Sequence, residues 1–129
     1  MSDFRKPVIA VVDDDLRVLE SLEDLLESAG HSVLLFQSAM TLLDGCGLST
    51  IDCLIADIGM PVVDGFELQR LARVRRPDLP VILITGRHEI ADQQRAIALG
   101  NQGFFQKPFN GAALLAAVAE AVRTARRGE

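Results

Sequence analysis

The sequence lacks the features that mark several classes of protein. No apolar run approaches the ~20 residues needed to span a membrane, and the polar first residues lack the apolar core of a signal peptide. Basic residues are also few: 13 Lys and Arg against 18 Asp and Glu give a net charge of −5. A duplex-binding domain normally needs a basic face. We therefore expect a cytoplasmic protein that binds neither a membrane nor nucleic acid directly.

Cysteine and histidine are equally scarce. The only cysteines are Cys46 and Cys53, and the only histidines, His31 and His88, are isolated from each other. This spacing resembles no zinc site, and two thiols in a cytoplasmic domain more often act as small apolar side chains than as a disulfide. We interpret all four residues as structural or incidental.

What the sequence does contain is an alternation of apolar runs and helical patterns. With 129 residues the chain has the size of one domain, which we assign to residues 1–129. Continuous apolar runs followed by helices predict an α/β fold with a doubly wound five-stranded parallel sheet, flavodoxin-like order 2-1-3-4-5 and helices on both faces. The expected strands are residues 8–12, 32–36, 52–57, 81–84 and 103–106. A helix is expected after each strand. The first is closed by Gly30, the second runs from Ser38 to about Leu43, and the last two span residues 89–99 and 111–125. The third is expected to turn inward Phe66, Leu68, Leu71, Ala72 and Val74.

Four of the five strands end in residues suited to a phosphoryl group and a cation. The first ends in three acids, Asp13 to Asp15, and the third ends in Asp57. The fourth ends in Thr85 and the fifth in Lys107. Because the carboxyl ends of parallel strands share one edge, where ligands bind in open α/β sheets, these groups can converge. Asp15 and Asp64 also fit the simpler role of helix N-caps.

The same motifs resemble the receiver domain of two-component response regulators over essentially the whole chain. Each motif alone is weak evidence, but together and in order they are strong. They are Val11-Val12-Asp13-Asp14-Asp15, Ala56-Asp57-Ile58-Gly59-Met60-Pro61 followed by Asp64-Gly65, Ile84-Thr85-Gly86, and Phe104-Phe105-Gln106-Lys107-Pro108-Phe109.

The resemblance implies a role for each acid at the sheet edge. Asp57 would take a phosphoryl group from a histidine kinase or phosphotransfer protein to form an acyl phosphate. Asp14 and Asp57 would bind Mg²⁺ directly, with the carbonyl of Gly59 as a third ligand and Asp13 acting mainly through water. A hard cation that keeps several waters suits such oxygen ligands.

The resemblance also implies how the site reports its state. Lys107 would pair with Asp57 and then with the phosphoryl oxygens, and the peptide bond to Pro108 would be cis. Thr85 would donate a hydrogen bond to the phosphoryl group, and its movement would let Phe104 turn inward. The surface formed by residues 89–99, 103–106 and 111–125 would then change and contact a partner or a second copy.

Several positions depart from the family pattern. Alanine usually follows the threonine and the glycine that ends the fourth helix, where this chain has Gly86 and Asn101. Gly59 and Arg87 each stand two residues beyond a site residue, on the route of an attacking water. Hydrolysis of the acyl phosphate should be poorly shielded, unless Arg87 folds across the phosphoryl group.

Three other functions remain to be weighed. Asp13-Asp14-Asp15 has the D-x-D spacing of haloacid dehalogenase-like phosphatases, but Arg17 stands where that group expects Thr or Val, and no room is left for a cap domain. A nucleotide-binding module would need a glycine-rich loop, and neither G-x-G-x-x-G nor a Walker sequence occurs. A receiver that acts without phosphorylation is disfavoured by the intact acids.

We therefore expect a signalling switch and not a metabolic enzyme. The only reactions that this switch would catalyse are its own aspartyl phosphorylation and dephosphorylation. Whether the chain is a stand-alone regulator or a receiver from a longer protein stays open.

Overall fold

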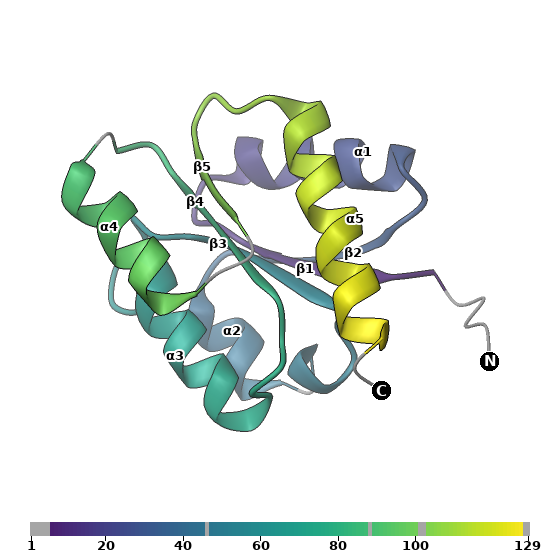
Figure 1. Cartoon of the computed structure of the whole chain (residues 1–129), viewed down its shortest axis with the longest axis horizontal. Helices are drawn as coiled ribbons and strands as arrows, with labels where there is room; N and C mark the ends of the chain where they lie inside the picture. The colour runs from purple at the N-terminus through teal and green to yellow at the C-terminus, as the bar shows by residue number, and fades with distance from the viewer. Residues whose placement is uncertain (1–5, 46, 88, 101–102, 128–129) are drawn as a thin grey trace.

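The computed structural model describes residues 6–45, 47–87, 89–100 and 103–127, without the side chains of 126 and 127. Within this part of the chain, five parallel strands form one sheet in the order β2-β1-β3-β4-β5, with helices on both faces (Figure 1). The predicted fold class and strand order are confirmed. The elements are β1 (Val8–Val12), α1 (Leu16–Ser28), β2 (Ser32–Phe36), α2 (Ala39–Asp44), the 3₁₀ turn η1 (Gly47–Ser49), β3 (Cys53–Asp57), α3 (Gly65–Arg75), β4 (Val81–Thr85), α4 (Ile90–Leu99), β5 (Gly103–Gln106) and α5 (Gly111–Arg127).

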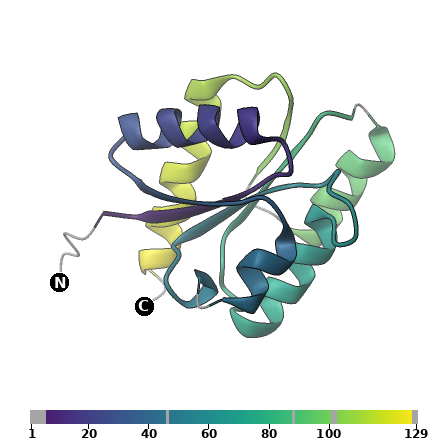
Figure 2. The same cartoon turned by 180° about the vertical axis from the view of Figure 1, so that it is seen from behind.

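Two apolar cores lie on opposite faces of the sheet. Helices α1 and α5 cover one face and α2, α3 and α4 cover the other (Figures 1 and 2). The three central strands are buried between them, and β3 and β4 are buried at every residue. This burial on both sides explains why the strands show no alternation of apolar and polar residues.

The local signals for helix ends act as the sequence indicates. The carboxylates of Asp15 and Asp64 and the hydroxyl of Ser38 cap α1, α3 and α2 by accepting hydrogen bonds from backbone N–H groups of the first turn. Gly30 and Gly100 follow helix ends with φ of +90° and +67°, a region that favours glycine. Among the described residues, no helix combines the length and hydrophobicity needed to cross a bilayer.

Helix α3 corrects one prediction about the core. Val74, expected inward, is 72% exposed. The helix buries Gly65, Leu68, Gln69 and Ala72, which share one face at the i, i+3, i+4, i+7 spacing. Val74 lies about 200° around the helix from Ala72 and so faces water.

The isolated thiol and imidazole positions add little to function. Cys53 is fully buried in β3, and burial raises the pKa of its thiol to about 12. Such a thiol is inert, in agreement with the structural interpretation. Cys46, His88 and Asn101 lie outside the described residues.

Candidate functional site

Three carboxylates meet at the carboxyl edge of the sheet. Asp13 and Asp14 follow β1, and Asp57 is the last residue of β3. One carboxylate oxygen from each lies within 4.8 Å of the others. Asp13 is fully buried and Asp57 is 5% exposed, while Asp14 is open to solvent. We call Asp13, Asp14 and Asp57 the acid edge.

The sheet itself brings the acid edge together. Strands β1 and β3 are parallel neighbours, with Val12 beside Ala56, so the next residue of each strand projects at the same edge. The backbone N–H of Asp13 donates to the carbonyl of Phe36 at 3.1 Å, and that of Ile58 donates to Ile84 at 2.9 Å. The ladders therefore hold Asp13 directly after the last paired residue of β1, and Asp57 as the last paired residue of β3.

Lys107 reaches the acid edge from the end of β5. Its Nζ donates to Oδ2 of Asp13 at 2.8 Å and lies 3.7 Å from Oδ2 of Asp57. The expected pair with Asp57 is present, but the hydrogen bond goes to Asp13. The Lys107–Pro108 peptide bond is cis, the isomer that the resemblance implied. Because Asp13 is the more buried carboxylate, it gains more from the ammonium group.

Burial dominates the electrostatics of Asp13. It raises the pKa of the Asp13 carboxyl above its ordinary value, and the hydrogen bonds from Lys107 and from the N–H of Asp15 only partly oppose this effect. A cation at the acid edge would favour the charged form of this group. The positive charge of Lys107 therefore does not fully offset the cost of burying the Asp13 carboxylate.

The loop after β3 places Gly59 beside the carboxylate of Asp57. The N–H of Gly59 donates to Oδ1 of Asp57 at 3.2 Å, and a Cβ at position 59 would lie 3.7 Å and 3.8 Å from the two carboxylate oxygens. A larger side chain there would cover the carboxylate. In the same loop Val62 is 99% exposed with φ +68°, a strained conformation for a β-branched residue.

Thr85 and Phe104 lie on the β4 and β5 side of the site. Thr85 is fully buried, and its Oγ1 accepts a hydrogen bond from the N–H of Arg87 at 2.9 Å. Phe104 is partly buried against the core beneath α2, α3 and α4. The sequence did not predict the Arg87 contact, since loop hydrogen bonds leave no periodic pattern.

A second unpredicted contact joins this loop to α4. The guanidinium of Arg87 forms an ion pair with Asp92, with Nη2 3.1 Å from Oδ1 and 3.0 Å from Oδ2. Arg87 was expected only as a possible cover for the phosphoryl group. Its present partner lies on the first turn of α4.

The donor set of the acid edge fits a hard divalent cation. Carboxylate oxygens with an adjacent main-chain carbonyl are ligands that suit Mg²⁺. Two of the three carboxylates are nearly buried, and the exposed Asp14 leaves an approach from solvent. The expected carboxylate ligands Asp13, Asp14 and Asp57 are thus gathered in one place, and Gly59 lies beside Asp57, to which its N–H donates.

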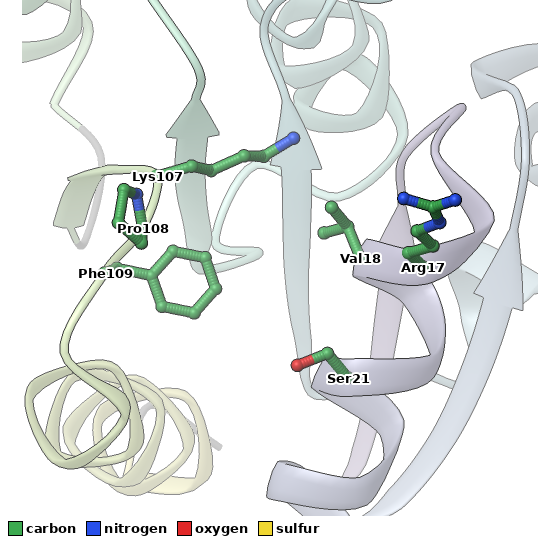
Figure 3. Close-up of a pocket in the computed structure, with 6 residues that line it drawn as sticks. All are labelled: Arg17, Val18, Ser21, Lys107, Pro108 and Phe109. Atoms are coloured by element: carbon green, nitrogen blue, oxygen red, sulfur yellow. The ribbon is translucent and has the colours of Figure 1, made fainter.

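A cavity of about 420 Å³ adjoins the site between α1 and the β5–α5 loop. Figure 3 shows Arg17, Val18 and Ser21 of α1 on one side, and Lys107, Pro108 and Phe109 on the other. Lys107 belongs both to the cavity wall and to the acid edge. A molecule in this cavity would lie beside Lys107.

This fold, with acids at the switch point and a lysine across from them, defines a receiver-type signalling domain. Residues 9–119 match the family model of the response regulator receiver domain. The chain therefore belongs to that family, and it is the receiver domain of a two-component response regulator.

Individual relatives agree with this assignment. The chain is 40% identical over 125 residues to the response regulator protein TodT of Pseudomonas putida, covering 97% of this chain and 55% of TodT. It is 35% identical to the transcriptional regulatory protein FixJ of Bradyrhizobium diazoefficiens, covering 91% and 57%. A receiver domain structure from Clostridium thermocellum superposes with a TM-score of 0.86 at 26% identity, covering 95% and 99%. The chain thus spans about half the length of the curated relatives it matches.

Proposed function

We propose that Asp57 is the phosphoacceptor of a Mg²⁺-dependent receiver that takes its phosphoryl group from a histidine kinase or a phosphotransfer protein. One observation carries the proposal. Asp57 ends a buried central strand within 4.8 Å of two further carboxylates and 3.7 Å from the ammonium of Lys107. This arrangement supplies a nucleophile and the means to offset negative charge around it.

In the proposed reaction a carboxylate oxygen of Asp57 attacks the phosphorus of a phosphohistidine. The P–O bond forms as the P–N bond breaks, and the imidazole leaves with the electron pair of that bond and takes a proton from solvent. Lys107 stays near the oxygens of the transferred group and stabilises their charge. Mg²⁺, when bound by the acid edge, would neutralise further charge on the phosphoryl group.

The donor is proposed to approach beside α1. The cavity between α1 and the β5–α5 loop has apolar walls from Val18, Pro108 and Phe109 and adjoins Lys107. A partner that places a phosphohistidine at the acid edge would cover this surface. Arg17 at its margin would add a cationic contact.

The surface formed by α4, β5 and α5 is proposed to change on phosphorylation and to contact the partner. Thr85 and Phe104 lie between the acid edge and this surface, where Ile90 and Ile97 are 73% and 75% exposed. Two exposed isoleucines on one short helix favour a contact with a partner, an output domain or a second copy. Phosphorylation would shift the population of two conformations of this surface.

The acceptor is tested by loading the protein with acetyl phosphate and Mg²⁺ and measuring its intact mass. We expect wild type to gain one phosphoryl group, and Asp57→Asn or wild type in EDTA to gain essentially none. Peptide mapping after borohydride reduction should find the label on Asp57. Equal uptake by Asp57→Asn would refute the proposal, and label on Asp13 would favour the phosphatase alternative. No uptake by folded wild type would favour a phosphorylation-independent interaction module.

A further inference from the structure

Helix α4 docks on the rest of the domain with little burial of apolar side chains. Of its ten residues, all within the described part of the chain, only Asp92 and Ala96 are buried. Its large apolar side chains, Ile90, Ile97 and Leu99, are 73%, 75% and 43% exposed. Most helices in proteins are held by the packing of an apolar face. Polar contacts must therefore hold much of α4 in place.

Two of these contacts come from one side of α3, which lies beside α4 in both views (Figures 1 and 2). The guanidinium carbon of Arg95 lies 4.3 Å from the ring centroid of Phe66. Arg73 donates from Nη1 to the carbonyl of Leu99 at 3.0 Å and from Nη2 to that of Gly100 at 3.1 Å. A helix leaves its last carbonyls without partners, and Arg73 supplies donors to them. Arg73 therefore favours the docked position of α4.

Gln69 lies close to these residues on α3 and has no such partner. Its side chain is 2% exposed, and neither Nε2 nor Oε1 of its amide has a hydrogen-bond partner in the described structure. It lies between Phe66 and Arg73 along the helix and within about 60° of each around it. Nε of Arg73, one turn further on, is also buried without a partner. A buried polar group left unpaired retains the full cost of its desolvation.

An apolar side chain at position 69 would avoid this cost. The nearest residues on the buried face of α3, Gly65, Leu68 and Ala72, have no polar side-chain atoms. The entry to α4 is also weakly held, since Gly86 has open space around it and the N-cap Glu89 makes no side-chain capping bond. Proteins tolerate local costs of this kind at functional sites, and moving elements come from regions of low stability. The unpaired amide thus fits a helix that has to leave its docked position.

We propose that Gln69 and Arg73 are positioning residues that act with opposite signs on the docking of α4 against α3. Gln69 opposes docking, because its amide gains hydrogen bonds to water when α4 moves away. Arg73 favours docking through the two carbonyls at the end of α4. Their balance keeps docking weak enough for added charge at the acid edge to displace α4. This last step rests on the function proposed above, while the docking balance itself does not require phosphorylation.

The docking balance is tested by amide hydrogen exchange of the metal-free protein at residues 96–99. Gln69→Met removes the unpaired amide at nearly constant volume and should slow exchange there about tenfold, the scale of an unsatisfied buried polar group. Arg73→Met should speed it about twofold. Gln69→Glu, which buries a charge, should speed it by at least about tenfold. The matched control is Gln94→Met, at an exposed position of α4, which should change exchange far less than Gln69→Met.

A role of Gln69 in core packing alone gives a different pattern. Gln69→Met would then change exchange only at amides that open by global unfolding, such as those of Leu54 and Leu83 in the buried central strands. Local exchange in α4 would stay as in wild type. That result overturns the inference, and so does a change of the same sign in Gln69→Met and Arg73→Met.

The consequence for switching is tested by calorimetric titration with beryllofluoride, an analogue of the phosphoryl group, in the presence of Mg²⁺. Coupling between two equilibria is reciprocal, so Gln69→Met should weaken beryllofluoride binding and Arg73→Met should strengthen it. Neither change should exceed the change in exchange of α4. If wild type binds no beryllofluoride, the proposed function fails, and the exchange data still decide the docking balance. If wild type and both variants bind it equally, the link between α4 docking and the switch is wrong.

Discussion

The acid edge and the β4–α4 region are built in opposite ways, although they adjoin. At the acid edge Asp13 follows β1 and Asp57 ends β3, two largely buried strands, and the backbone N–H groups of Asp13 and Ile58 donate to neighbouring strands. Gly65 packs so closely on the end of β3 that a Cβ would lie 2.7 Å from the carbonyl oxygen of Asp57. The chemistry is thus held on a rigid scaffold.

Beyond β4 the chain is loosely packed. Gly86 has open space around it, Arg87 is exposed, and α4 starts without a side-chain cap. Ile90 and Ile97 of the same helix are largely exposed. In the proposed function, added charge would therefore rearrange this region at little cost while the acid edge stays fixed. Regions of low local stability are the ones from which moving elements are drawn.

The largest effect should come from adding a methyl group at Gly65, with the same addition at Gly86 for comparison. Gly65→Ala places a Cβ against main-chain atoms of Asp57 and Ile58 at 2.7–2.9 Å, so the backbone must shift. We expect the free energy of unfolding to fall by about 3 kcal/mol and phosphoryl uptake to slow. Gly86→Ala meets no atom, and φ at this position is not positive. It should stabilise the protein by about 0.5 kcal/mol through the unfolded chain.

Urea unfolding followed by circular dichroism measures both variants, because the chain has no Trp or Tyr for fluorescence. Similar losses in the two variants would show that the β4–α4 loop is as tightly constrained as the acid edge. The contrast between the regions would then be wrong.

A middle-sized effect concerns the buried charge at Asp13. Burial raises the pKa of this carboxyl, so the folded protein binds the proton more tightly than the unfolded chain. Ionised Asp13 therefore destabilises the metal-free fold above the raised pKa, and this penalty disappears as pH falls through that pKa towards the ordinary value. Asp13→Asn in EDTA should be more stable than wild type at pH 7 by about 1 kcal/mol, with Lys107 keeping Asp57 as a partner.

Measuring the stability difference as a function of pH and with Mg²⁺ distinguishes the cost of the buried Asp13 charge from a change in side-chain packing. The advantage of Asp13→Asn should shrink as pH is lowered below neutrality, and adding Mg²⁺ should stabilise wild type more than the variant. Asp15→Asn is the control, because Asp15 is an exposed cap and not a member of the acid edge. A stability difference that stays constant with pH would contradict the role of the buried charge.

The rigid region was also the more predictable one from sequence. Apolar runs ending in Asp13, Asp57, Thr85 and Lys107 predicted the strand ends, and parallel topology then placed these residues at one edge. The strand order 2-1-3-4-5 was predicted from the flavodoxin-like pattern of doubly wound sheets. Long apolar runs of this kind arise because the residues are buried, and burial can be read from the order of apolar and polar residues.

The details that could not be predicted depend on individual side-chain contacts. The hydrogen bond of Lys107 to Asp13, not Asp57, depends on which carboxylate lies deeper. The ion pair of Arg87 with Asp92 depends on a loop conformation, and the burial of Gln69 at the expense of Val74 depends on the rotation of α3. One rotamer or one loop conformation decides each of the first two contacts, and no pattern in the sequence encodes it, whereas the position of Val74 follows from the 100° step per residue of a helix.

The smallest effect concerns the opposite end of α4 from Asp92. Arg73 of α3 donates from Nη1 to the carbonyl of Leu99 at 3.0 Å and from Nη2 to that of Gly100 at 3.1 Å. These bonds satisfy acceptors that a helix end leaves unpaired. Arg73→Met should lower the free energy of unfolding by only about 0.5 kcal/mol. It should also speed hydrogen exchange in the last turn of α4.

The same variant should leave amide exchange at Ile58 and Asp13 unchanged, because the hydrogen bonds that protect them lie in the strand ladders and not in α4. Arg70→Met is the matched control: it removes an arginine from the same helix, but one that pairs only with Glu67 on the surface. That pair should be worth almost nothing in stability. If Arg73→Met loosens the acid edge as much as α4, the two regions unfold as one unit. The proposed switch, in which a fixed acid edge acts on a loosely packed α4, would then be wrong.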